Sequence, residues 1–270
     1  MTVNIKDAKR IVVKVGTSSL THKNGKINLG SIEKFARVLS DLQNMGKEMI
    51  LVSSGAVGVG VSRMGLKEKP SSTKGKQAAA AVGQCHLMNI YSKFFGEYGH
   101  IVAQVLLTRD VIEDDRMRNN VCNTFDTLLE QGIIPIVNEN DTVSIDEIEN
   151  ICNFGDNDNL SAIVSLLTNA DLLIILSDID GFYNGDPRKD KNAKLIREIE
   201  EITDEVRGCA GDAGSKLGTG GMRTKISAAE KVVEKGISMI LANGEHPEIL
   251  RDILVENKKV GTLFIGKKEM

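Results

Sequence analysis

Residues 10–19 of the chain read RIVVKVGTSS, an apolar β-branched run followed by a glycine and small hydroxyl residues. β-branched side chains favour a strand, and we predict one over Arg10–Val15 that ends at Gly16. Lys14 is costly to bury in such a strand unless another group pairs with its charge. It either faces solvent from an edge strand or serves a ligand. The NH groups and hydroxyls of residues 16–19 can bind an anion, which favours the ligand.

Strand and helix patterns alternate along the rest of the chain. Apolar residues at helical spacing predict a helix that Ser31 caps and Gly46 ends, and similar patterns recur further on. We expect strands at residues 49–52, 101–107, 133–137, 172–176 and 237–241, and helices at about residues 76–95, 120–130, 159–167 and 224–235. Continuously apolar strands fit a parallel sheet covered on both faces. The predicted fold class is therefore α/β, an αβα sandwich with a mainly parallel central sheet and two lobes.

Length and composition exclude several classes of protein. The 270 residues are enough for one large domain or two joined lobes, and 34 Lys+Arg against 37 Asp+Glu leave a net charge of −3. This balance argues against a nucleic-acid partner, because nucleic-acid binding usually leaves a basic excess. Neither a membrane-length apolar run nor a signal peptide is present, so we expect a cytoplasmic protein with no membrane partner. The cysteines and histidines lack CxxC and HExxH spacing, so no zinc site is expected.

Small and polar residues follow four of the predicted strands. In an open α/β sheet, ligands bind beyond the carboxyl ends of the strands. The residues at these ends therefore indicate one shared cleft, and they are residues 14–19, Ser53–Ala56, Asn138–Asp141 and Ser177–Asp178.

A second glycine-rich stretch, GTGGMRTK at residues 218–225, opens a predicted helix. Helix N-termini attract anions, whereas Arg223 and Lys225 in the first turn oppose the helix dipole, and a phosphate would remove that conflict. The alternative is a flexible glycine loop with solvated cations. Neither a GK[ST] triplet nor a complete GxGxxG is present, so the common nucleotide fingerprints are absent. The glycine clusters at residues 55–65 and 208–221 indicate backbone close to a ligand.

Two clusters of acids and amides lie in the middle of the chain, NEND at residues 138–141 and DNDN at residues 156–159. One side chain of the second cluster can be the N-cap of the helix that follows. Asparagine offers both donors and acceptors, which suits the amino and carboxylate groups of a small zwitterion. The polar segment 138–158 is long for an α/β connection, which predicts a functional loop that separates the two lobes.

Together these motifs resemble the amino acid kinase family over residues 10–264. The resemblance rests on VKVGTS at 13–18, VSSGA at 52–56, NEND at 138–141, GDNDNL at 155–160, GTGGMRTK at 218–225, and DGFY at 180–183 with DPR at 186–188. The DGxY and DPR pair is similar to aspartokinases and uridylate kinases as well. The NEND and GDNDNL pair is similar to the members that phosphorylate glutamate.

The resemblance implies an amino acid kinase-like fold that transfers the γ-phosphoryl group of ATP to the side-chain carboxylate of L-glutamate, the first step towards proline. It implies catalytic roles for Lys14, Asp158 and Lys225, with Asp158 orienting the two lysines. It implies glutamate binding by Ser54, Gly55, Ala56, Asp141 and Asn157. For ATP it implies Lys14, Ser177, Asp178, Thr219, Gly220, Gly221, Met222, Arg223, Thr224 and Lys225.

Further expectations also come from the resemblance. Mg²⁺ would sit mainly on phosphate oxygens and water, so no protein ligand is named for it. Residues 1–170 would form a glutamate-binding lobe and residues 171–270 an ATP-binding lobe, in the form without the C-terminal PUA domain of many bacterial relatives. Proline is expected as a feedback inhibitor, with the insertion-like segment 144–154 able to alter that response. A homodimer or homotetramer is expected, with functional coupling to glutamate-5-semialdehyde dehydrogenase.

Other functions stay open at this point. The closest alternative is an amino acid kinase with N-acetylglutamate or aspartate as acceptor. A non-catalytic sensor of amino acids or nucleotides on the same fold is a second alternative. Lys14, Asp158 and Lys225 argue against the sensor, because it could dispense with them.

Overall fold

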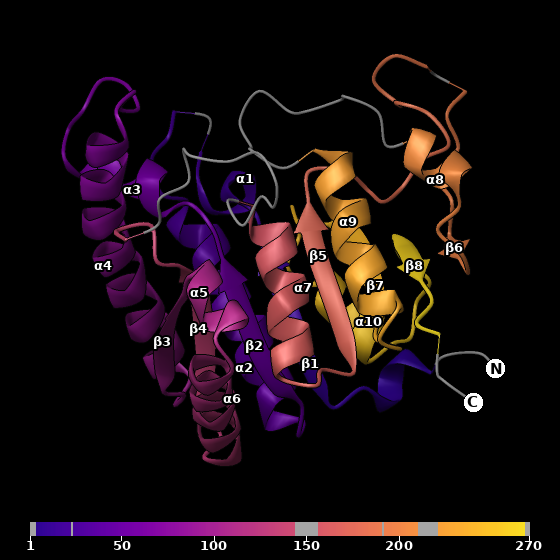
Figure 1. The fold of residues 1–270 in the computed structure, drawn as a ribbon, viewed down its shortest axis with the longest axis horizontal. Coiled ribbons are helices and arrows are strands. Elements are labelled where there is room, and N and C mark those ends of the chain that lie inside the picture. Colours follow the sequence, from indigo (N-terminus) through magenta and orange to yellow (C-terminus); the bar gives the residue numbers. More distant parts are fainter. Residues whose placement is uncertain (1–3, 23, 144–155, 191, 210–220, 268–270) are drawn as a thin grey trace.

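A computed structural model describes residues 4–22, 24–143, 156–190, 192–209 and 221–267. Within them, eight strands form one sheet in the order β3-β4-β2-β1-β5-β7-β8-β6 (Figure 1). Their bounds are β1 Arg10–Val15, β2 Glu48–Ser53, β3 Val102–Leu107, β4 Ile134–Glu139, β5 Leu172–Ser177, β6 Glu198–Ile199, β7 Ser238–Asn243 and β8 Thr262–Phe264. The pairs are parallel except β7 with β8. The predicted mainly parallel sheet is confirmed.

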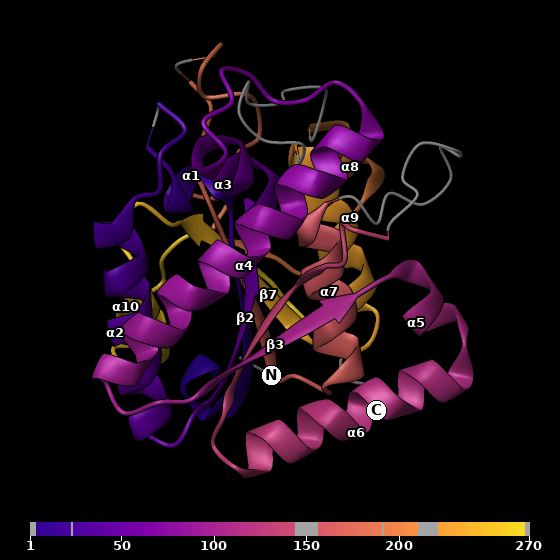
Figure 2. The same ribbon diagram turned by 90° about the vertical axis from the view of Figure 1, so that its left-hand side faces the viewer.

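Helices cover both faces of this sheet (Figure 2). Their bounds are η1 Ile5–Asp7, α1 Thr17–Leu20, α2 Leu29–Asn44, α3 Ala56–Arg63, α4 Thr73–Glu97, α5 Arg109–Glu113, α6 Asp115–Glu130, α7 Asn157–Leu167, α8 Asp204–Cys209, α9 Met222–Val233 and α10 Ile249–Leu254. One apolar core lies under α2, α3, α4 and α10, and the other lies under α6, α7 and α9. The αβα sandwich is therefore confirmed.

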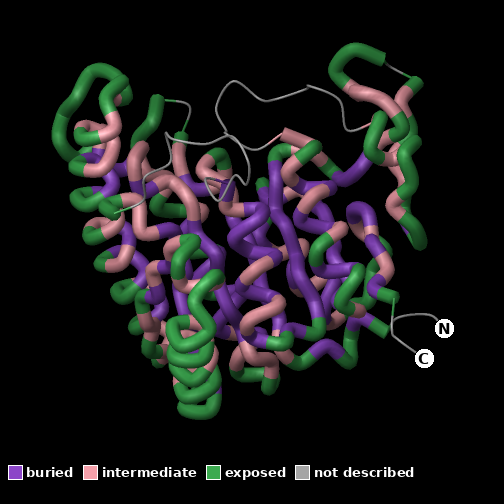
Figure 3. The backbone as a smooth tube through the Cα atoms, viewed as in Figure 1, coloured by how far each residue is buried: buried purple, intermediate pink, exposed green. Residues whose placement is uncertain are grey.

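Alternation along β1 decides where Lys14 points. Val13 and Val15 belong to the core under α2 and α4, whereas Val12 belongs to the core under α7 and α9. Lys14 has the same parity as Val12 and so faces α7 and α9. It does not lie on an edge strand, because β1 pairs with β2 on one side and β5 on the other. Figure 3 shows the strands as the buried interior of the molecule.

The predicted element positions hold, with corrections at their ends. The cap of α2 is Asn28, whose side chain accepts a hydrogen bond from the backbone NH of Ser31, so Ser31 as cap is wrong. The Asn28 backbone is non-helical, and its side chain satisfies a backbone NH of the first turn, as an N-cap does. Asn138 and Glu139 belong to the end of β4, where they pair with β3, and do not follow the strand. The short strands β6 and β8 were not predicted, because two or three residues carry no readable period.

Helices α3 and α4 pack against each other at unusually short range. A Cβ added to Gly60 would lie 1.7 Å from the carbonyl oxygen of Ala79, and one added to Gly83 would lie 1.8 Å from that of Ala56. The prediction that the glycines of 55–65 approach a ligand is therefore wrong for Gly60, which serves helix packing. This packing fixes the start of α3 against α4.

None of the described helices combines the length and the apolar character that spanning a bilayer requires.

Candidate active site

The carboxyl ends of β1, β2, β4 and β5 meet at one edge of the sheet, where the described residues form a cleft of about 780 Å³. Most of the predicted site residues line it, namely Lys14, Ser54, Gly55, Ala56, Asp141, Asn157, Ser177, Asp178 and Lys225. Of the rest, Asp158 lies beneath the two lysines, and Gly221, Met222, Arg223 and Thr224 stand at the start of α9 without lining the cleft. Thr219 and Gly220 lie outside the described residues, as does the segment 144–154.

Asp158 joins the two lysines at one end of the cleft. Its Oδ1 lies 2.6 Å from Nζ of Lys14, and its Oδ2 lies 2.9 Å from Nζ of Lys225. Thr224 also donates its hydroxyl to Oδ2, at 3.0 Å. Asp158 is fully buried, and the two lysines are 7% and 6% exposed. We call Lys14, Asp158 and Lys225 the phosphoryl end of the cleft.

The sheet and two helices bring these three groups together. Lys14 is on β1, Asp158 is in the first turn of α7, and Lys225 is in the first turn of α9. Both helices lie on the face of the sheet towards which Lys14 points, and they pack on each other. Asp156 caps α7 by accepting the backbone NH of Asp158 at 3.1 Å, so the predicted N-cap within the DNDN cluster is confirmed.

Burial and charge act in opposite directions on the two acids of this end. Burial alone would raise the pKa of Asp158, but the adjacent charges of Lys14 and Lys225 outweigh it and hold that pKa well below its usual range. The charge of Lys14 lowers the pKa of Asp156 too weakly to offset its burial. Burial and then the negative charge of Asp158 raise its pKa above the ordinary value. The phosphoryl end thus keeps Asp158 ionised between two cations.

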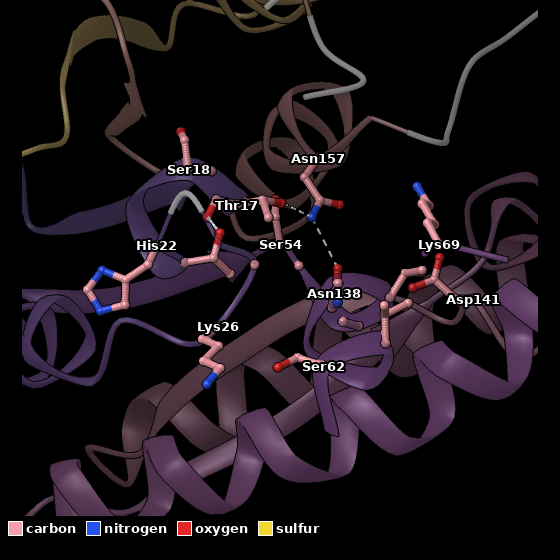
Figure 4. Close-up of a pocket in the computed structure, with 18 of the residues that line it drawn as sticks. Thr17, Ser18, His22, Lys26, Ser54, Ser62, Lys69, Asn138, Asp141 and Asn157 are labelled. Atoms are coloured by element: carbon pink, nitrogen blue, oxygen red, sulfur yellow. Dashed lines mark hydrogen bonds between the residues drawn. The ribbon is translucent and has the colours of Figure 1, made fainter. Parts of the chain in front are cut away.

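The other end of the cleft is built from uncharged groups. Asn157 places its Nδ2 2.7 Å from the Ser54 hydroxyl, 3.0 Å from the Ser53 carbonyl oxygen and 3.2 Å from Oδ1 of Asn138 (Figure 4). We call Ser54, Asn138 and Asn157 the acceptor end. Gly55 precedes α3 with φ of +95°, a left-handed conformation that glycine adopts without strain.

The cleft also has walls that the sequence analysis did not identify. Residues 21–22 and 24–26 contribute one wall, with His22 and Lys26 labelled in Figure 4, and residues 57–69 contribute another. The first is a hairpin closed by the bridge between Thr21 and Ile27. An Asn-Gly pair at 24–25, with Gly25 at φ of +77°, is the turn signal that could have revealed it.

Comparison with known proteins places the chain in a class. The sequence model of the amino acid kinase family matches residues 9–243 of the chain. The chain belongs to the amino acid kinase family, as its motifs suggested.

The chain is 68% identical to a glutamate 5-kinase of Clostridium perfringens, over 98% of each chain. It is 57% identical to a glutamate 5-kinase of Listeria monocytogenes, over 100% of this chain and 97% of the relative. Its fold is similar to that of a UMP kinase from Bacillus anthracis, with a TM-score of 0.63, 15% sequence identity, and 97% and 98% of the two chains covered. At that identity the likeness to the UMP kinase speaks for the fold alone.

Proposed function

We propose that the protein transfers the γ-phosphoryl group of ATP to the side-chain carboxylate of L-glutamate, as the first step of proline biosynthesis. The relatives of 57% and 68% identity that are named glutamate 5-kinase support this acceptor. The observation that carries the chemistry is the placement of two lysine ammonium groups on one buried carboxylate, at 2.6 and 2.9 Å.

The phosphoryl end supplies the positive charge that this reaction needs. A carboxylate oxygen of glutamate attacks the γ-phosphorus, the bond from that phosphorus to the ADP oxygen breaks, and ADP and glutamyl 5-phosphate result. Two anions must approach, and the charge spreads over the transferring group. Lys14 and Lys225 stabilise that charge, and Asp158 holds both lysines in place before the substrates arrive.

The remaining residues divide between the substrates. Ser54, Gly55, Ala56, Asp141 and Asn157 bind glutamate, with Asp141 as partner of the ammonium group. Ser177 and Asp178, together with residues 219–225, hold ATP. This division corresponds to an N-terminal lobe at 1–170 for glutamate and a C-terminal lobe at 171–270 for ATP.

Mg²⁺ fits this site as an ion held mainly by ATP. Among the described residues, no three His, Cys, Asp or Glu side chains gather as a set of metal ligands. Asp156 lines the cleft, and its Oδ2 is buried without a hydrogen-bond partner among those residues. Mg²⁺ takes one or two carboxylates alongside phosphates and water, so Asp156 would hold it, and the ion would neutralise phosphate charge.

The test is an assay of the purified chain with MgATP and L-glutamate. ADP release that requires L-glutamate, and a hydroxamate formed when hydroxylamine traps the acyl phosphate, are the expected results. N-acetylglutamate and L-aspartate are the matched alternative acceptors. Turnover with one of them alone would overturn the glutamate assignment, and binding without any turnover would favour a sensor.

Three associated proposals need separate experiments. We propose that L-proline inhibits the reaction, that the chain forms a homodimer or homotetramer in the cytoplasm, and that it is coupled to glutamate-5-semialdehyde dehydrogenase. Titration of L-proline into the assay tests the first, and light scattering tests the oligomer. The coupling is tested by adding the dehydrogenase, since a coupled pair should pass on the acyl phosphate without releasing it into solution.

A further inference from the structure

Helix α4 reaches the acceptor end through two polar side chains. The hydroxyls of Tyr91 and Ser53 are 2.9 Å apart and buried. Gln84, seven residues before Tyr91 on the same helix, accepts a hydrogen bond at Oε1 from Nδ2 of Asn138, at 2.9 Å. Gln84 does not line the cleft, whereas Asn138 does. Its action on a ligand would therefore pass through Asn138.

The hydrogen bonds continue from Asn138 to the cleft. Oδ1 of Asn138 accepts from Nδ2 of Asn157, and the same nitrogen reaches the Ser54 hydroxyl and the Ser53 carbonyl oxygen. These three neighbours all act as acceptors, which fixes the amide nitrogen of Asn157 on their side. Figure 4 shows the oxygen of Asn157 turned away from Ser54 and Asn138.

Gln84 supports the outer end of this series of amides. The Ser53 carbonyl oxygen can only accept, so it fixes the nitrogen of Asn157, and the oxygen of Gln84 then holds the nitrogen of Asn138 towards α4. Without that acceptor, the Asn138 amide can rotate by half a turn and set its NH₂ group against the NH₂ of Asn157. Two donors cannot bond each other, so Asn157 would lose one of its three acceptors and be held by the Ser53 carbonyl oxygen and the Ser54 hydroxyl alone.

The packing of α4 keeps Gln84 at this position. The neighbouring Gly83 lies so close to α3 that an added Cβ would meet the Ala56 carbonyl oxygen at 1.8 Å. Helix α4 therefore cannot shift along α3 without a clash, and the distance from Gln84 to Asn138 is set by backbone contact.

We propose that Gln84 is a positioning residue for the acceptor amino acid, because it holds Asn138 as an acceptor for Asn157 and so helps to keep the Asn157 oxygen facing the cleft, where it accepts from the substrate ammonium group. The identity of that amino acid as L-glutamate rests on the proposed function. The role of Gln84 deepens it by adding the Asn157 amide, which is supported from outside the cleft, to Asp141 in the recognition of the ammonium group.

Gln84→Leu removes the acceptor, and Gln84→Glu keeps one at the same place. Asn89→Leu is the control, since Asn89 is an exposed amide on the same helix. We expect Gln84→Leu to raise KM for L-glutamate about tenfold, the size of one lost hydrogen bond, with kcat and KM for ATP nearly unchanged. Gln84→Glu should stay within about threefold of the parent chain, and Asn89→Leu should match it.

Calorimetric titration of L-glutamate without ATP provides a second readout, and thermal unfolding checks that each variant is folded. Equal losses in Gln84→Leu and Gln84→Glu, or an unchanged KM in Gln84→Leu, would overturn the positioning role while leaving the proposed function intact. A parent chain that neither binds nor phosphorylates L-glutamate would overturn the proposed function, and this inference with it.

Discussion

The two ends of the cleft solve their tasks with different chemistry. The phosphoryl end buries full charges, with Asp158 ion-paired to Lys14 and Lys225. The acceptor end uses amides and hydroxyls, in which Asn157 bonds Ser54 and Asn138. Charges act strongly at short range in a buried site, whereas amides confer direction. Substitutions at the phosphoryl end should therefore lower kcat strongly. Substitutions at the acceptor end should have smaller effects, mainly on the affinity for the substrate.

The largest effect is expected from Asp158→Asn. The variant leaves two buried lysines without their counter-charge, so both ammonium groups lose their fixed position. We expect kcat to fall by about a thousandfold, because preorganised charge supplies much of such a reaction. The affinity for L-glutamate, measured by calorimetry, should change less than about threefold. A variant that kept a tenth of the parent kcat would remove the contrast between the two ends.

The same substitution has a pH signature in stability. The folded pKa of Asp158 lies below the unfolded value, so its ion pairs stabilise the fold above about pH 4 and are lost as the pH falls towards the folded pKa. Urea unfolding between pH 3 and 7 should show a smaller acid-induced loss in Asp158→Asn than in the parent chain. Equal slopes in both proteins would contradict the pairing.

The next effect concerns the packing behind the acceptor end. Gly83→Ala places a Cβ 1.8 Å from the Ala56 carbonyl oxygen, so α3 and α4 must separate. We expect a loss of about 3 kcal/mol in the free energy of unfolding, as overpacking commonly costs. KM for L-glutamate should also rise more than KM for ATP, because Gly83 adjoins Gln84 and lies against α3.

Gly96→Ala is the matched control on the same helix, because an added Cβ there meets no atom within 4 Å. Its free energy of unfolding should rise by about 0.5–1 kcal/mol, since alanine favours a helix over glycine. If Gly83→Ala and Gly96→Ala changed the free energy of unfolding similarly in urea, the contact between α3 and α4 would have room for an added Cβ.

A gain in stability is expected from Asp156→Asn. The pKa of Asp156 is raised in the fold, so its ionised form destabilises the protein as the pH rises through that folded pKa. Asparagine caps a helix as well as aspartate does and carries no charge. We expect the variant to be more stable than the parent at pH 7 and about equally stable at pH 3, below the ordinary pKa. Its activity should fall if Asp156 holds Mg²⁺. A loss of stability at pH 7 would contradict the raised pKa.

The sequence revealed the two ends to different extents, for physical reasons. Lys14 was visible as a charge within an apolar strand, and Asp156–Asn159 as polar residues ahead of a helix, because both patterns are local. The partner of Lys14 was suggested only by family resemblance, since 144 residues separate it from Asp158. Gln84 gave no signal, because a glutamine within an alanine-rich helix is ordinary.

The fold shows the same limit. Long apolar strands and helices were predictable from their period, whereas β6 and β8 were too short to show one. The role of Gly60 in packing depends on Ala79 of another helix, which periodicity along one segment does not reveal.

The smallest effect should come from Lys231→Met, at a contact between the helices that carry the charged end. Nζ of Lys231 on α9 donates to Oδ1 of Asn159 on α7 at 2.7 Å, and the Ser227 hydroxyl donates to the same oxygen at 3.2 Å. These bonds join the helices of Lys225 and Asp158, but Lys231 is exposed and Ser227 remains when it is lost. We expect kcat to fall about two- to threefold, with both KM values unchanged, as for one exposed hydrogen bond. Lys235→Met, an exposed lysine near the end of the same helix, is the control. A tenfold loss would mean that alignment of α7 and α9, and not only charge, limits turnover at the phosphoryl end.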